Sequence, residues 1–103
     1  MLEKLCSVTD IGDGEARRFE LGNLRIAVVH IDGDFYAIGD RCSHADISLA
    51  EGEVDVKART LECWKHGSCF SLETGVPNTL PATKAVPTFE LRVEDGDLYV
   101  EVH

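Results

Sequence analysis

Two short segments of this 103-residue chain each pair one thiol with one imidazole, and both groups bind metals. The first is Cys42-Ser43-His44 and the second is Cys63-Trp64-Lys65-His66. If the chain between them folds back on itself, four soft or borderline donors come within reach of one centre. The sequence therefore predicts a metal site built by two loops, with these two cysteines and two histidines as ligands.

Two kinds of centre can use such a donor set. One is a tetrahedral zinc ion, and the other is a two-iron cluster with both cysteines on one iron and both histidines on the other. Zinc modules usually group like ligands, as C-x2-4-C followed by H-x3-5-H. Here each loop supplies one cysteine and one histidine, so each of two irons can draw one ligand from each loop, and the spacing favours the cluster.

The elements that position the loops read as short strands, because apolar and polar residues alternate or β-branched residues gather between turn residues. The predicted strands are residues 3–8, 16–21, 24–31, 35–38, 54–56, 60–62, 68–72, 88–94 and 97–102. Asp32-Gly33 and Asp95-Gly96 are two-residue hairpin signals. Residues 47–49 predict a helical or irregular turn, and residues 76–85 an ordered loop. The predicted fold class is all-β: a small antiparallel sandwich or barrel with the two metal loops at one end.

Length and composition place the chain among ordinary globular proteins. It has 103 residues with 44% hydrophobic and 28% charged side chains, which predicts one domain over residues 1–103. The start, Met1-Leu2-Glu3-Lys4, lacks a basic region followed by an apolar run, so we expect no signal peptide, no membrane span and a cytoplasmic location.

The charge balance bears on partners. Nineteen acidic against ten basic side chains give a net charge of -9, which argues against nucleic acid and anionic membranes. It favours a basic partner surface, although acidity that serves solubility alone is the other interpretation.

With these residues in view, the chain resembles the Rieske-type [2Fe-2S] ferredoxins. Cys42-Ser43-His44 and Cys63-Trp64-Lys65-His66-Gly67 match the family's two cluster-binding loops, and the likeness extends to Phe70, Thr74-Gly75 and Leu80-Pro81-Ala82. The resemblance implies that Cys42 and Cys63 are the thiolate ligands of one cluster and that His44 and His66 are the imidazole ligands. It also implies that Pro81 belongs to a loop over the cluster.

Two departures from the family pattern carry information. Eighteen residues separate His44 from Cys63, a little more than expected, and the excess is predicted at a hairpin tip over residues 56–59. The respiratory branch has an extra cysteine in each loop, whereas this chain has Ala45-Asp46-Ile47 in one and Lys65 in the other, so that disulfide cannot form. The likeness is therefore to the low-potential branch, the soluble ferredoxins that feed aromatic-ring oxygenases.

The side chains that follow the second loop are expected to tune the potential. The high-potential branch has a serine and a tyrosine whose hydroxyls donate to sulfur, and here the positions are Ser68 and Phe70. One donor is kept and one is missing, which predicts a potential of roughly -150 mV, near the low end for Rieske centres. Trp64 is either an exposed docking aromatic or a lid over the cluster.

The resemblance implies a one-electron carrier, not a catalyst. Its partners would be a flavin-dependent ferredoxin reductase and a terminal non-heme iron oxygenase. Two alternatives are a Rieske protein in redox sensing or iron-sulfur assembly, and a zinc interaction module with the same four ligands. Cys6 and Cys69 are expected to be structurally ordinary thiols, as His30 is expected to be a packing or surface residue, although Cys69 lies close enough in sequence to replace a ligand.

Overall fold

The structure of the chain is a computed structural model that describes residues 2–22, 24–40, 48–63, 68–77 and 85–101. Within these ranges every regular element is a strand or a short 3-10 turn, and the strand pairs are antiparallel, which confirms the predicted all-β class. The same ranges contain no helix long and apolar enough to cross a membrane.

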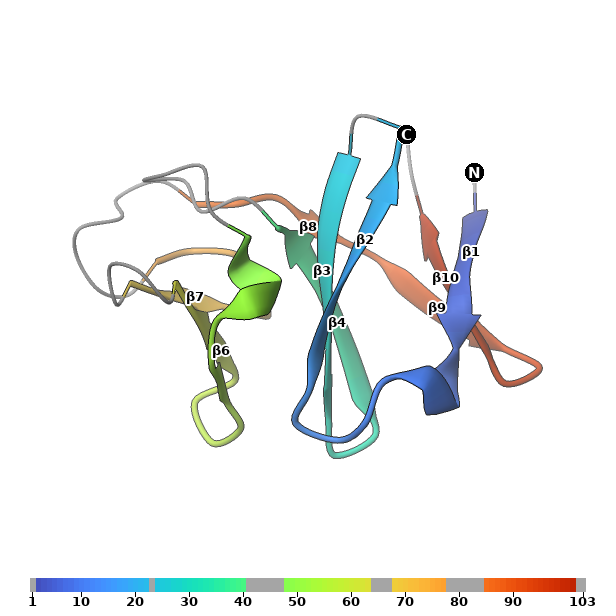
Figure 1. The fold of residues 1–103 in the computed structure, drawn as a ribbon, viewed down its shortest axis with the longest axis horizontal. Coiled ribbons are helices and arrows are strands. Elements are labelled where there is room, and N and C mark those ends of the chain that lie inside the picture. The colour runs from blue at the N-terminus through green and yellow to red at the C-terminus, as the bar shows by residue number, and fades with distance from the viewer. Residues whose placement is uncertain (1, 23, 41–47, 64–67, 78–84, 102–103) are drawn as a thin grey trace.

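The strands form three small sheets (Figure 1). The first sheet has the order β1 (Leu2–Ser7), β10 (Asp97–Glu101), β9 (Leu91–Glu94). The second has the order β2 (Ala16–Leu21), β3 (Leu24–Ile31), β4 (Asp34–Gly39), β8 (Thr88–Phe89). The third has the order β5 (Val54–Asp55), β6 (Thr60–Glu62), β7 (Cys69–Ser71). Two 3-10 turns, η1 (Val8–Asp10) and η2 (Leu49–Glu51), lie in the connections.

The second sheet lies between the other two and is covered on both faces, as Figure 1 shows. Successive side chains of β3 point to opposite faces, so the apolar residues from Ile26 to Val29 contribute alternately to two cores. Ile26 and Val28 pack with Leu98 and Val100 of the first sheet. Ala27 and Val29 pack on the other side with the third sheet and η2. A strand that is buried on both faces needs apolar residues at every position, whereas a strand with one exposed face alternates apolar and polar residues.

Both Asp-Gly signals form the predicted tight turns. Asp32 and Gly33 have φ of 48° and 83°, and Asp95 and Gly96 have φ of 52° and 77°. Two consecutive positive φ values define the turn that matches the twist of a hairpin, and aspartate and glycine adopt them at low cost. The β3–β4 and β9–β10 hairpins are therefore set by local sequence.

One predicted strand is wrong in extent. Residues 88–94 were expected to form a single strand, but the structure breaks it at Glu90 into β8, which pairs with β4, and β9, which pairs with β10. The carbonyl of Glu90 accepts a hydrogen bond from the Glu101 amide at 2.9 Å, where the chain passes from one sheet to the next. Phe89 and Leu91 both pack in the core between these sheets. The alternation of apolar and polar residues over 88–94 is therefore the same for one continuous strand as for a strand that changes sheets at Glu90.

The third sheet is held against the second at its turn. The four residues 56–59 close the β5–β6 hairpin, where the sequence predicted a tip, and Arg59 has a left-handed φ of 54°. Its Nη1 donates to Asp34 Oδ2 at 3.0 Å and to Tyr36 Oη at 2.5 Å, both on β4. These hydrogen bonds raise the pKa of the Arg59 guanidinium, that to Tyr36 most. Arg59 thus ties the hairpin tip to the central sheet.

Candidate metal centre

Three of the eight predicted site residues lie within the described ranges: Cys63, Ser68 and Phe70. The other five lie outside them, and they are Cys42, His44, Trp64, His66 and Pro81. What the structure supplies is the base of each loop, namely the residues from which the chain leaves the fold and to which it returns.

The second loop leaves from the end of β6. Cys63 follows Glu62 directly and is fully buried, with its side chain in the core that also holds Leu61 and Phe70. The amide of Cys63 donates to the carbonyl of Ser68 at 2.7 Å, so the two ends of the loop meet before β7 begins. A thiol in this position has an anchored backbone and an environment that excludes water.

The first loop leaves from the end of β4, where Asp40 is buried with 1% of its surface exposed. Asp40 Oδ2 accepts a hydrogen bond from Ser48 Oγ at 2.6 Å, and Oδ1 accepts one from the Ala50 amide at 2.9 Å. The carbonyl of Asp40 also accepts from the Leu49 amide at 2.5 Å. Residues 40 and 48, on either side of the segment that contains Cys42, are therefore bonded to each other.

The two loop bases are tied to each other. Leu49 is fully buried in the same core as Cys63. The amide of Gly52 donates to Leu49 O at 3.0 Å, and a Cβ on Gly52 would lie 1.6 Å from the carbonyl oxygen of Glu62. Only glycine permits so close an approach, which places the chain leaving the first loop against the residue that precedes Cys63.

A third segment begins and ends beside β7. Pro77 forms an antiparallel bridge with Phe70, and the amide of Val86 donates to Gly75 O at 2.9 Å. Gly75 has a φ of +76°, and a Cβ on it would lie 2.1 Å from the carbonyl oxygen of Val86. The ends of the predicted proline loop are thus held at β7, directly after the second loop, whereas Pro81 itself lies outside the described residues.

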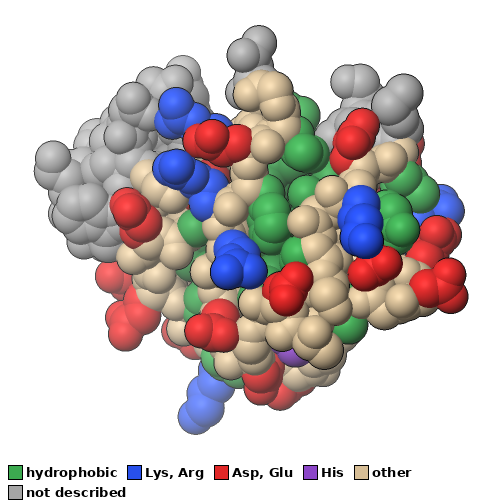
Figure 2. Space-filling view, turned by 45° about the vertical axis from the view of Figure 1, so that its right-hand side comes forward, with side chains coloured by type: hydrophobic (Ala, Val, Ile, Leu, Met, Phe, Trp, Pro, Cys, Tyr) green, Lys and Arg blue, Asp and Glu red, His purple; other side chains and the backbone are tan. Residues whose placement is uncertain are grey.

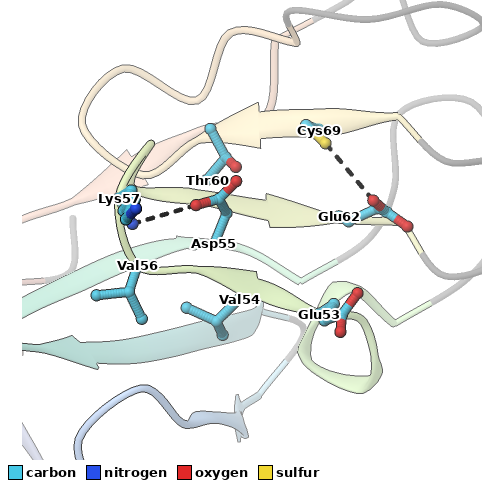
Figure 3. A pocket seen from close by; sticks show the side chains of 8 residues that line it. All are labelled: Glu53, Val54, Asp55, Val56, Lys57, Thr60, Glu62 and Cys69. Atoms are coloured by element: carbon cyan, nitrogen blue, oxygen red, sulfur yellow. Dashed lines mark hydrogen bonds between the residues drawn. The ribbon is translucent and has the colours of Figure 1, made fainter.

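Two thiols outside the predicted ligand set have separate surroundings. Cys69, on β7, donates from its Sγ to Glu62 Oε2 at 3.8 Å and faces a hollow of about 330 Å³ over the third sheet (Figure 3). Cys6 lies on β1 in the first sheet, where desolvation by partial burial, with Asp10 and Asp97 nearby, raises the pKa of its thiol. Among the described residues no group of three or more His, Cys, Asp or Glu side chains could hold a metal ion.

His30 has a structural role, as the sequence predicted. Its Nδ1 lies 2.9 Å from the carbonyl oxygen of Ile11, and its ring stacks on Phe35 with the centroids 4.4 Å apart. It occupies β3, within the central sheet, and serves packing.

The donor set and the loop bases fit a single buried centre. Thiolate and imidazole ligands suit zinc or iron-sulfur chemistry, and the bases of the two predicted loops are tied to each other through Gly52 and Leu49. The fold and the predicted donor set together define the class of protein: a small all-β metalloprotein whose centre is predicted between two loops.

The particular family follows from comparison with known proteins. The chain belongs to the Rieske [2Fe-2S] domain family, whose pattern it matches over residues 2–90. It is 41% identical over 97 residues to the 3-phenylpropionate/cinnamic acid dioxygenase ferredoxin subunit of Escherichia coli K12, an alignment that covers 94% of this chain and 90% of the relative.

Solved structures agree. The ferredoxin of carbazole 1,9a-dioxygenase from Nocardioides aromaticivorans IC177 superposes with a TM-score of 0.93 at 25% identity, covering 96% of this chain and 95% of that one. A complex of reduced oxygenase and oxidized ferredoxin in carbazole 1,9a-dioxygenase matches with a TM-score of 0.89 at 36% identity, covering 96% and 91%.

Family membership decides between the two kinds of centre considered from the sequence. The cofactor is one [2Fe-2S] cluster per chain, and the zinc alternative is set aside. The relatives are ferredoxin subunits, so the protein is an electron-transfer component and not itself the catalyst.

Proposed function

We propose that the protein carries single electrons from a flavin-dependent ferredoxin reductase to a terminal non-heme iron oxygenase. The observation that carries the proposal is the 41% identity, over nearly the whole chain, to the ferredoxin subunit of a dioxygenase. A solved complex of oxygenase and ferredoxin with the same fold supports the second partner. The reductase follows from the carrier role, because each electron delivered must be replaced.

The proposed ligands are Cys42 and Cys63 on one iron and His44 and His66 on the other. Their support is the pairing of one cysteine and one histidine in each loop, together with the buried position of Cys63 at a closed loop base. When bound, the cluster supplies a one-electron redox couple. The chain's own contribution is to exclude water at Cys63 and to hold both loop bases in fixed positions.

The two histidines are the proposed exit for the electron. Cys63 packs against Leu61 and Phe70 in the core, so the thiolate side of the centre faces the protein interior. Imidazole ligands donate less negative charge than thiolates, so the iron that they bind is the better acceptor of the added electron. A partner that docks over the loops then approaches the imidazole side, where Trp64 is also proposed to lie.

The test is reconstitution with a flavin-dependent ferredoxin reductase and a terminal non-heme iron oxygenase from the same organism. Product formation should require all three components and should stop when His44 is replaced by alanine, since cluster incorporation is lost. Cys6→Ser is the matched control and should keep full activity, because Cys6 lies on β1 in the first sheet. A protein that holds its cluster but supports no oxygenase turnover would favour the redox-sensing or assembly role instead.

A cytoplasmic location is part of the same proposal. The expected result is recovery of the protein with cytoplasmic markers on fractionation of the native cells, and recovery with the membrane or an exported fraction would contradict it.

A further inference from the structure

Asp40 stands out among the buried polar residues because of what it joins. It is 1% exposed, and all its polar groups are bonded: its amide donates to Arg25 O at 2.9 Å, its carbonyl accepts from Leu49, and its two carboxyl oxygens accept from Ser48 and Ala50. One partner is on β3, which precedes the first loop, and three follow that loop. Asp40 therefore joins the chain before the first loop to the chain after it by hydrogen bonds.

A carboxyl group is energetically unfavourable at a position as buried as this one. A buried carboxyl costs free energy unless it is fully hydrogen-bonded, and an apolar side chain of similar size would avoid that cost. An apolar side chain could not, however, accept from the Ser48 hydroxyl and the Ala50 amide at once. The carboxyl specifies where residues 48–50 lie relative to the end of β4.

That specification reaches the second loop. Leu49 is held by the carbonyl of Asp40 and packs in the core with Cys63. Gly52, bonded to Leu49, lies against the carbonyl of Glu62, the residue before Cys63. A continuous series of contacts thus runs from Asp40 to the backbone of the proposed second-loop ligand.

We propose that Asp40 is a positioning residue for the cluster, which sets the first loop in register with the second so that both pairs of ligands meet. The inference rests on the ligand assignment under Proposed function. Ser48 takes part in the same positioning, because its hydroxyl donates directly to the Asp40 carboxyl.

Three variants separate positioning from general stability. Asp40→Ala removes both side-chain hydrogen bonds. Ser48→Ala removes one of them. Asp40→Asn keeps the shape: its amide oxygen can accept from Ala50, and its amide nitrogen can donate to the Ser48 hydroxyl, which can serve as either partner. The control is Val100→Ala, a fully buried residue of β10 in the other core, which lowers stability without touching a loop base.

The experiment measures loss of the visible absorption of the purified holoprotein in excess iron chelator, at temperatures set equally far below the Tm of each variant. Asp40→Ala should release its cluster at least about tenfold faster than Val100→Ala, the factor that corresponds to about 1.4 kcal/mol, because two buried side-chain hydrogen bonds are lost. Ser48→Ala should lie between them, and Asp40→Asn should stay within about threefold of the unsubstituted protein.

A second readout is the resonance spectrum of the reduced protein. Poorly placed ligands should broaden the signal in Asp40→Ala and Ser48→Ala and leave it sharp in Val100→Ala. Equal release rates and equal line widths for Asp40→Ala and Val100→Ala would overturn the inference, as would an Asp40→Asn variant that behaves like Asp40→Ala. If Asp40→Ala does not fold, the comparison of Ser48→Ala with Asp40→Asn decides in the same way. Retention of the cluster by Cys42→Ala would instead refute the ligand assignment.

Discussion

The substitution Phe70→Tyr tests how the chain sets the potential of its cluster. Phe70 lies on β7 and is fully buried, in the same core as Cys63. The new hydroxyl would enter a space without water, so it must find a partner there or remain unpaired. We predict that it donates to a sulfur of the centre, in the position that the sequence comparison with the high-potential branch indicates.

The magnitude follows from the strength of such a bond. A hydrogen bond to a charged group contributes about 1.5 to 3 kcal/mol, of which roughly 1 to 2 kcal/mol differs between the two oxidation states. Because the donor stabilises the added negative charge, it favours the reduced state. At about 59 mV per 1.4 kcal/mol for one electron, the potential should rise by about 40 to 85 mV.

Voltammetry and denaturant unfolding, measured on the same samples, give a paired result. A hydroxyl that meets sulfur raises the potential and leaves stability nearly unchanged. A hydroxyl left unpaired in this core leaves the potential unchanged and lowers the free energy of unfolding by about 1 to 3 kcal/mol, and that outcome would mean that the side chain of residue 70 does not reach the cluster. Phe19→Tyr, the same chemical change against the other core, is the matched control and should leave the potential where it is.

Three further predictions concern other parts of the chain. Gly52→Ala should prevent normal cluster incorporation and destabilise the fold by about 1 to 3 kcal/mol, since its Cβ would overlap Glu62 O; metal analysis and thermal unfolding check both. The pKa of Cys6 is raised above 9.0 in the folded chain, so folding should lose stability as pH rises through that value, and Cys6→Ser should reduce the loss measured by urea unfolding. Electron transfer to the partner should slow between about 0.05 and 0.3 M salt if acidic side chains steer docking, and a rate independent of salt would leave the charge to solubility alone.

The salt prediction depends on where the charges lie, not only on their sum. Figure 2 shows acidic and basic side chains interspersed over the sheets on one face. Among the described residues, the surface pairs Lys4 with Asp97 at 3.4 Å and Arg18 with Glu20 at 3.3 Å neutralise each other locally. Exposed pairs of this kind add little stability. A steering field must therefore come from acidic side chains that have no such basic neighbour.

The features that depend on short stretches of sequence could be predicted. The Asp-Gly turns, the alternating arms around them and the β5–β6 hairpin follow from backbone preferences and period-2 patterns. The division into three sheets could not be predicted in this way. At Glu90 the side-chain pattern continues unchanged while the hydrogen-bond partner switches from β4 to β10, and that choice depends on residues far away in the chain.

The site shows the same limit. Paired cysteines and histidines mark the loops, because donor types and spacing are local. Asp40 and Ser48 were missed, because an aspartate after a strand and a serine before a turn are ordinary in sequence. Their role becomes visible only when burial and the bond between Asp40 and Ser48 are known. The available signal was weak: an acidic residue two positions before Cys42, with a hydroxyl residue four positions after His44.

The most direct test of the central claim is metal and sulfide analysis of the purified protein, combined with its resonance spectrum before and after reduction. We predict about two irons and two acid-labile sulfides per chain, and a rhombic signal that appears only on reduction. Alanine at any one of the four proposed ligands should abolish all three. A colourless protein with one zinc ion per chain, or a full complement of iron and sulfide in the His66→Ala variant, would contradict it.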